Sequence, residues 1–185
     1  KAFVYLVQRE RITHTFLVPP QFSAILSLEN LEKDSFSSLK TILSAGSPLR
    51  LDVKENILTS MSENLFELYG FSEGFATMLK PHDQRKKFGS VGTPVLGFEI
   101  KIIDEKGNEC SPNVAGEIAG YGAGMMKEYY REVELTNSLI WIDNRGRSFI
   151  KSGDIGSLDE DGFLTILDRK KDMIITGGYN VYPAE

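Results

Sequence analysis

Residues 39–74 read LKTILSAGSPLRLDVKENILTSMSENLFELYGFSEG, and the order of the patterns within them indicates the fold. The apolar run 39–43 leads into a loop of small residues, and apolar side chains then recur at helical spacing between 50 and 62. A second apolar run, 65–69, ends in another loop rich in Gly and Ser. A strand, a helix and a strand in this order are typical of a βαβ unit in a parallel sheet.

This alternation continues upstream and stops near Gly89. Residues 15–18 form a β-prone apolar run, and apolar residues at helical spacing follow within 22–26. After Gly89, residues 98–102 alternate between apolar and polar side chains, as in an antiparallel strand with one buried face. Hairpin-type turn sequences separate such runs at Lys106–Asn108, Asn144–Gly146 and Asp161–Gly162. We expect an α/β protein in which a parallel-sheet portion is followed by a small antiparallel β-barrel-like subdomain.

The composition disfavours several classes of ligand. The 185 residues are 41% hydrophobic and 25% charged, which is usual for a globular protein with a buried core. A net charge of −5 disfavours a general electrostatic interaction with nucleic acid or with an anionic membrane face. Cys110, His14 and His82 cannot assemble a zinc site from thiolate and imidazole alone. A bound metal should therefore be a hard ion on carboxylates and phosphates.

The ends of the chain and its apolar runs give expectations about location and length. No apolar run is long enough to cross a bilayer, and no signal-peptide pattern stands at the start. We therefore expect no integral membrane segment and a cytoplasmic location. The chain begins at Lys1 and ends at Glu185 within patterned sequence, which predicts that the same polypeptide continues at both ends.

Two loops follow the expected parallel strands and form a candidate ligand site. Ligands bind open α/β sheets beyond the carboxyl ends of the strands, where loop N–H groups are free. Small residues at 44–49 would let a flat ring or a phosphate approach the backbone. Ser72 offers a hydroxyl for a phosphate, and Glu73 offers a carboxylate for Mg²⁺. The same residues also suit tight turns without a ligand, and their spacing alone leaves both interpretations open.

Five phrases in this chain resemble, in order, motifs of the AMP-forming acyl-activating superfamily. Its members include acyl-CoA synthetases, aryl-CoA ligases, luciferases and peptide-synthetase adenylation domains. The phrases are LSAGSPL at Leu43–Leu49, YGFSE at Tyr69–Glu73, GEIAG at Gly116–Gly120, KSGD at Lys151–Asp154, and DRKKDMIITGGYN at Asp168–Asn180, followed by Pro183 and Glu185. A further phrase, GAGMMKEYY at Gly122–Tyr130, resembles CoA ligases more than peptide-synthetase domains.

The resemblance implies a two-step reaction. A carboxylic acid, here expected to be a fatty acid, attacks ATP held with Mg²⁺ to give acyl-AMP and pyrophosphate, and the thiol of coenzyme A then takes the acyl group. By the same resemblance, Ala45, Gly46 and Ser47 flank the adenine of ATP or AMP. Tyr69 and Gly70 line the adenine and acyl pocket.

Five further positions match functional residues of that family. Ser72 stands where the family usually has threonine and keeps a hydroxyl for phosphate, while Glu73 matches the carboxylate that binds Mg²⁺. Asp154 matches the acid that accepts both ribose hydroxyls, which requires two acceptor oxygens on one planar group. Arg169 matches a cation near the ribose and phosphate, and Lys171 falls at the hinge of a small C-terminal domain.

The resemblance also suggests how the chain is divided. Residues 1–88 would be the C-terminal part of an α/β subdomain of a large adenylation domain, 89–167 a β-rich subdomain, and 168–185 the hinge and the start of the small domain. Gly177 and Gly178 match a loop that is brought to the active site for thioester formation.

Two family features have no counterpart in this sequence: the Gly/Ser/Thr-rich phosphate loop with its lysine, and the lysine of the small C-terminal domain. We therefore expect this chain alone to be an inactive fragment of the ligase. An aryl-CoA ligase and an adenylation domain that loads a carrier protein remain alternatives. A nucleotide-binding module without catalysis is an alternative of a different class.

Overall fold

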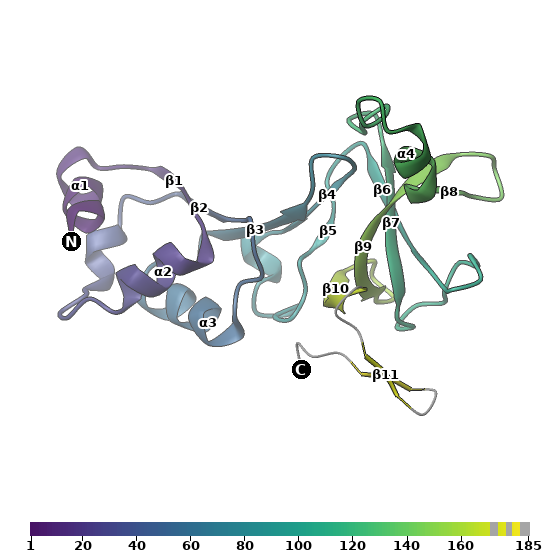
Figure 1. Cartoon of the computed structure of the whole chain (residues 1–185). Helices are drawn as coiled ribbons and strands as arrows, with labels where there is room; N and C mark the ends of the chain where they lie inside the picture. The colour runs from purple at the N-terminus through teal and green to yellow at the C-terminus, as the bar shows by residue number, and fades with distance from the viewer. Residues whose placement is uncertain (171–173, 177–178, 182–185) are drawn as a thin grey trace. The chain divides into compact units, whose positions relative to one another are not determined.

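The computed structural model describes residues 1–170 and, in addition, 174–176 and 179–181 (Figure 1). The chain forms two compact units: Lys1–Tyr69 with Met78–Gly92, and Gly70–Thr77 with Thr93–Glu185. The domain limits expected at 88 and 167 follow from the family resemblance and not from compactness, and they stay predictions.

The first part of the chain alternates between helices and strands. Its elements are α1 (Ala2–Glu10), β1 (His14–Leu17), α2 (Pro19–Leu26), the 3-10 helix η1 (Lys33–Phe36), β2 (Thr41–Ser44), α3 (Leu51–Ser60), β3 (Leu65–Gly70), β4 (Ala76–Leu79), the 3-10 helix η2 (Pro81–Asp83) and β5 (Thr93–Pro94). β1, β2 and β3 are adjacent and parallel, and Ile42 of β2 lies opposite Thr15 on one side and Leu65 on the other. The βαβ unit expected within residues 39–69 is confirmed.

The elements begin and end close to the expected positions, with local differences that have a hydrogen-bonding cause. β2 starts at Thr41 because Leu39 still belongs to the turn that closes η1, where its N–H donates to the Phe36 carbonyl at 2.9 Å. α3 ends at Ser60 because the N–H groups of Met61 and Ser62 both turn back to one carbonyl, that of Ile57.

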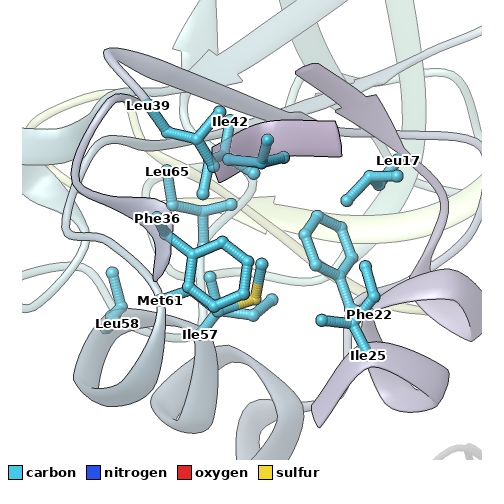
Figure 2. Close-up of a cluster of buried hydrophobic side chains, with 11 residues drawn as sticks. Leu17, Phe22, Ile25, Phe36, Leu39, Ile42, Ile57, Leu58, Met61 and Leu65 are labelled. Atoms are coloured by element: carbon cyan, nitrogen blue, oxygen red, sulfur yellow. The ribbon is translucent and has the colours of Figure 1, made fainter. Parts of the chain in front are cut away.

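One face of the parallel sheet carries the core of the first unit (Figure 2). Leu17, Ile42 and Leu65 come from the three parallel strands and point toward side chains of α2 and α3. The labelled members of this cluster are Leu17, Phe22, Ile25, Phe36, Leu39, Ile42, Ile57, Leu58, Met61 and Leu65. Packing of the helices on this face fixes the strands, and the loops after β2 and β3 then begin at the carboxyl edge of the sheet.

The second unit is built mainly from antiparallel strands. Its elements after β5 are β6 (Phe98–Ile103), β7 (Gly116–Gly122), α4 (Val133–Leu139), β8 (Ile140–Ile142), β9 (Ser148–Leu158), β10 (Leu164–Arg169), β11 (Ile174–Thr176) and β12 (Tyr179–Val181). The strand order is β10-β9-β7-β6, with β8 paired to β9, and each neighbouring pair is antiparallel. A parallel α/β portion followed by an antiparallel β subdomain is therefore the observed fold class, as expected.

The three turn sequences of this half also have the predicted role. Gly107, Gly146 and Gly162 adopt positive φ angles of 81°, 76° and 80°, which glycine reaches without the steric cost of a side chain. At all three turns an Asp side chain, Asp104, Asp143 or Asp159, accepts hydrogen bonds from N–H groups within the turn. Within the described part of the chain, no helix combines the length and apolar character needed to cross a membrane.

Candidate functional site

The loop after β2 presents the first group of expected site residues. Ala45 is partly buried, while Gly46 and Ser47 are exposed. Gly46 has a φ of +94°, a conformation that favours glycine, and it turns the chain out of the strand. Ser44 pairs in register with Glu67, so the loop after β2 and Tyr69 near the end of β3 lie at the same edge of the sheet. This is where open α/β sheets bind ligands.

A buried ion pair lies on the core side of that edge. Lys54 of α3 and Glu67 of β3 have side chains only 1% and 9% exposed, and Lys54 Nζ lies 2.7 Å from Glu67 Oε1. The attraction between the two opposite charges favours the charged form of the carboxyl group. Lys54 Nζ also donates to the Phe88 carbonyl and lies 4.9 Å from the centre of the Phe88 ring. The ammonium group thus ties three segments of the first unit together.

Burial and charge act in opposite directions on Glu67. Burial raises the pKa of its carboxyl group, while Lys54 and Gln84 favour the charged form and lower it, and the net result is a raised pKa. Gln84 is itself fully buried and donates to the Leu65 carbonyl at 3.1 Å. The first unit therefore keeps a polar cluster inside its core, directly before Tyr69.

Sequence reasoning did not single out this cluster, although a signal was present. Lys54 precedes the buried Ile57, Leu58 and Met61 on the same helical stripe, and Glu67 alternates with Leu65 on the buried face of β3. A charged residue at each of two core positions predicts an ion pair, because a lone buried charge is costly.

The turn between β3 and β4 carries Ser72 and Glu73, in the second unit. Gly70 begins this turn, where a Cβ would meet the Phe75 carbonyl oxygen at 2.4 Å, so only glycine fits. The turn is seated on β7 through Phe75, since a Cβ on Gly120 would lie 1.8 Å from its ring. Ser72 is exposed and Glu73 is partly exposed, which leaves both side chains available to a ligand.

Glu73 is held by the loop that follows β7. The Tyr129 hydroxyl donates to Glu73 Oε1 at 2.8 Å, and the Met126 N–H donates to the Glu73 carbonyl at 2.9 Å. The hydrogen bond to the carboxylate raises the pKa of Tyr129, so the phenol remains a donor. Sequence reasoning placed Tyr129 in a family-like phrase but gave it no role at the site.

Asp154 lies at a bulge in β9, and the sequence Ser152-Gly153-Asp154 accounts for the shape of this bulge. Ser152 Oγ donates to the Ile118 carbonyl at 3.0 Å and accepts the Asp154 N–H at 3.0 Å. Gly153 takes a φ of +75°, and the pairing with β7 shifts register across these residues. The result is a carboxylate, 18% exposed, whose backbone is fixed from both sides.

Arg169 lies opposite Asp154 across the β9–β10 pair. Its Nε is 3.6 Å from Asp154 Oδ1, and its own side chain is 66% exposed. The next residue, Lys170, donates its N–H to the Gly153 carbonyl and its ammonium group to Glu117 Oε2 at 2.8 Å. The structure therefore brings the expected ribose acid and the expected cation together. The remaining expected residues, Lys171, Gly177 and Gly178, lie outside the described residues.

The donor set at Glu73 fits a magnesium ion that arrives with a nucleotide. Among the described residues, no group of three or more His, Cys, Asp or Glu side chains could hold a metal ion by itself. Mg²⁺ keeps several waters and is commonly bound by one or two carboxylates plus substrate phosphates. One partly exposed carboxylate beside the Ser72 hydroxyl matches that requirement.

Comparisons with known proteins identify the family of the chain. A family model described as AMP-binding enzyme matches residues 1–130. The chain is 37% identical, over 165 residues and 89% of its length, to a long-chain-fatty-acid–CoA ligase of Salmonella typhimurium. An amide bond synthetase from Marinactinospora thermotolerans matches 99% of the chain with a TM-score of 0.89 and 30% identity. The O-succinylbenzoate coenzyme A synthetase of Bacillus subtilis, solved in complex with ATP and magnesium ion, matches 99% with a TM-score of 0.85 and 32% identity.

In each comparison the match covers a minor part of the relative. The chain spans 28% of the Salmonella ligase and 37% of each of the two solved structures. The family model nevertheless covers more than half of this chain, and its range includes the Ala45–Ser47 loop and Glu73. On the strength of this match, the chain belongs to the AMP-binding enzyme family, whose adenylate-forming members include acyl-CoA ligases.

Proposed function

We propose that this chain supplies part of the nucleotide-binding site of an enzyme that activates a carboxylic acid with ATP and transfers the acyl group to coenzyme A. The observation that carries the proposal is Asp154, a carboxylate fixed by the Ser152–Gly153 bulge with Arg169 beside it. A rigid carboxylate can accept both hydroxyls of a ribose, because it offers two oxygens in one plane.

The position of each remaining residue supports a role in binding the nucleotide or its metal ion. The backbone at Gly46 and Ser47 is open for a flat adenine to approach, and Tyr69 offers an aromatic surface at the same edge of the sheet. Ser72 would donate to a phosphate oxygen, and Glu73 would bind the Mg²⁺ that accompanies ATP. When bound, that ion would neutralise phosphate charge while the carboxylate of the acid substrate attacks ATP. Arg169 would add a positive charge near the ribose and phosphate.

The proposed acid is a fatty acid, supported by the likeness to the Salmonella ligase. Other relatives carry different names, including a feruloyl-CoA synthase from Amycolatopsis at 32% identity. An aryl acid, a carrier protein as the acyl acceptor, and nucleotide binding without catalysis are therefore outcomes that the experiment must separate.

The test is acid-dependent exchange between ATP and pyrophosphate, measured with the intact protein that contains this sequence. A panel of fatty and aryl acids is screened first, and coenzyme A or a carrier protein is then offered to the adenylate. Exchange that depends on a fatty acid, followed by a CoA thioester, supports the proposal. Binding of ATP without exchange for any acid would overturn it in favour of a non-catalytic module. The 185-residue chain by itself is expected to show no exchange.

Asp154→Ala tests the ribose contact directly. Loss of hydrogen bonds to a charged group costs roughly 1.5 to 3 kcal/mol each, so affinity for ATP should fall more than tenfold. Asp161→Asn is the matched control, because it removes an aspartate from an exposed hairpin turn and leaves an Asn-Gly turn of the same kind. Unchanged affinity in Asp154→Ala, measured by calorimetric titration, would show that the ribose assignment is wrong.

A further inference from the structure

We propose that Tyr129 is a positioning residue for Glu73: its phenol fixes one carboxylate oxygen so that the other faces the Mg²⁺ of the nucleotide. This inference rests on the proposed function of Glu73. The contact that carries it joins residues far apart in the sequence, the turn after β3 and the loop after β7, through a 2.8 Å hydrogen bond.

The contact engages only one oxygen of the carboxylate. Tyr129 donates to Glu73 Oε1, and among the described residues Oε2 accepts no hydrogen bond. The Met126 N–H holds the backbone of the same glutamate at its carbonyl, 2.9 Å away. Glu73 is thus restrained at its main chain and at one side-chain oxygen, and one oxygen is left for a ligand.

Tyr129 is itself fixed by the start of α4. Its N–H donates to Thr136 Oγ1 at 2.9 Å, and Thr136 Oγ1 donates to the Glu132 carbonyl at 2.9 Å. Thr136 is buried, with 6% of its surface exposed. The loop from Met126 to Thr136 is therefore held by hydrogen bonds at Glu73 and at Thr136. The position of the Tyr129 phenol is fixed by the same contacts.

A phenol suits this task better than a cationic side chain. A neutral donor orients a carboxylate and leaves its full negative charge for a metal ion, whereas a lysine or arginine would neutralise that charge and compete with the metal. Hydrogen-bond partners of metal ligands commonly contribute about 10- to 100-fold to metal affinity by orienting the ligand. We expect an effect in this range from the loss of the Tyr129 hydroxyl.

Tyr129→Phe removes only the hydroxyl, and Tyr130→Phe is its matched control because Tyr130 is 80% exposed. Two quantities are measured on the intact protein: the Mg²⁺ concentration that half-saturates ATP binding, by calorimetry, and Mn²⁺ binding in the presence of ATP, by electron paramagnetic resonance. Tyr129→Phe should weaken both by about 10-fold or more, with little change in KM for the carboxylic acid or in thermal midpoint. Tyr130→Phe should leave both unchanged.

Two further variants keep the outcomes distinguishable. Thr136→Val removes the acceptor that holds the Tyr129 backbone and should weaken metal binding in the same direction by a smaller factor. Glu73→Gln removes the proposed metal ligand itself. If Glu73→Gln raises the Mg²⁺ requirement and Tyr129→Phe does not, the inference about Tyr129 is wrong while the proposed function stands. If Glu73→Gln itself leaves the requirement unchanged, the proposed metal site fails.

Discussion

Glu67 and Glu73 stand on either side of the Tyr69–Gly70 step, and their surroundings are opposite. Glu67 lies in the core of the first unit, paired with the ammonium group of Lys54 at 2.7 Å. Glu73 lies in a turn of the second unit, partly exposed, and its partners are the neutral phenol of Tyr129 and a backbone N–H that donates to its carbonyl. Glu67 is buried and paired with a cation. Glu73 is oriented by a neutral donor, which does not neutralise its negative charge.

The difference shows what separates a structural carboxylate from one that can bind a ligand. A buried carboxylate needs a cation, and once paired it has little charge left to offer. A carboxylate that binds Mg²⁺ must be reachable and held by donors that do not neutralise it. We therefore expect changes at the Lys54–Glu67 pair to alter stability and changes at Glu73 to alter chemistry.

The largest expected effect on stability follows from breaking the buried pair. Lys54→Met leaves Glu67 as an uncompensated buried charge and should lower the free energy of unfolding by about 3 to 5 kcal/mol. The double variant Lys54→Met/Glu67→Gln removes both charges and should recover much of this loss. Urea denaturation of the wild type, Lys54→Met and the double variant measures the free energy of unfolding of each. Equal losses in the single and double variants would mean that the contact of the Lys54 ammonium group with the Phe88 carbonyl, which both variants lose, and not the ion pair, is what stabilises the core.

The second effect is a pH dependence of smaller size. Burial raises the pKa of Glu67 in the folded protein, so the folded state binds more protons than the unfolded state between the two pKa values. Stability contributed by this group is therefore highest at low pH and falls as pH rises through the folded pKa. In Lys54→Met the total fall should be larger and should extend to higher pH, because no cation opposes the effect of burial, and lowering the pH should restore part of the lost stability.

The double variant serves as the control for this pH dependence, since it has no carboxyl group at residue 67. Its stability difference from Lys54→Met should shrink as the pH is lowered. Denaturation curves at several pH values measure this difference. A difference that stays constant with pH would contradict the idea that Glu67 is the titrating group.

The smallest effect is expected at an ion pair near the surface that is only partly buried. Glu99 of β6 binds the Arg147 guanidinium, which lowers the pKa of its carboxyl group, and its side chain is 43% exposed. Solvent-exposed pairs contribute about 0 to 1 kcal/mol, so Glu99→Gln should cost no more than that near neutral pH. The difference from wild type should vanish as pH falls through the lowered pKa and should shrink in high salt. A loss as large as that of Lys54→Met would undo the contrast between buried and exposed pairs.

Much of the fold could be predicted from the sequence because the elements that pack in the core have clear patterns of apolar residues. The helical spacing of 50–62 and the apolar runs around it correspond to α3, β2 and β3, since a helix over a parallel sheet must bury one stripe and one face. Turn chemistry likewise marked the hairpins at Gly107, Gly146 and Gly162.

The site was predictable only in part, for a physical reason. Asp154 and Glu73 belong to short phrases, so their candidacy could be read locally. Two of the contacts that support them could not be read in this way: Tyr129 donates to Glu73, and Ser152 donates to the Ile118 carbonyl, across long separations in sequence that only the folded chain closes. The Lys54–Glu67 pair was not predicted from the sequence, although both residues occupy core positions of their elements.

One comparison tests the central claim most directly: acid-dependent ATP–pyrophosphate exchange and thermal midpoint, measured together for Glu73→Gln and for the Lys54→Met/Glu67→Gln double variant. Removal of a single preorganised electrostatic contact commonly costs about 10²- to 10³-fold in rate, so Glu73→Gln should lose exchange by that order while keeping its midpoint. The double variant should exchange within a few-fold of wild type. Wild-type exchange and an unchanged Mg²⁺ requirement in Glu73→Gln would contradict the account.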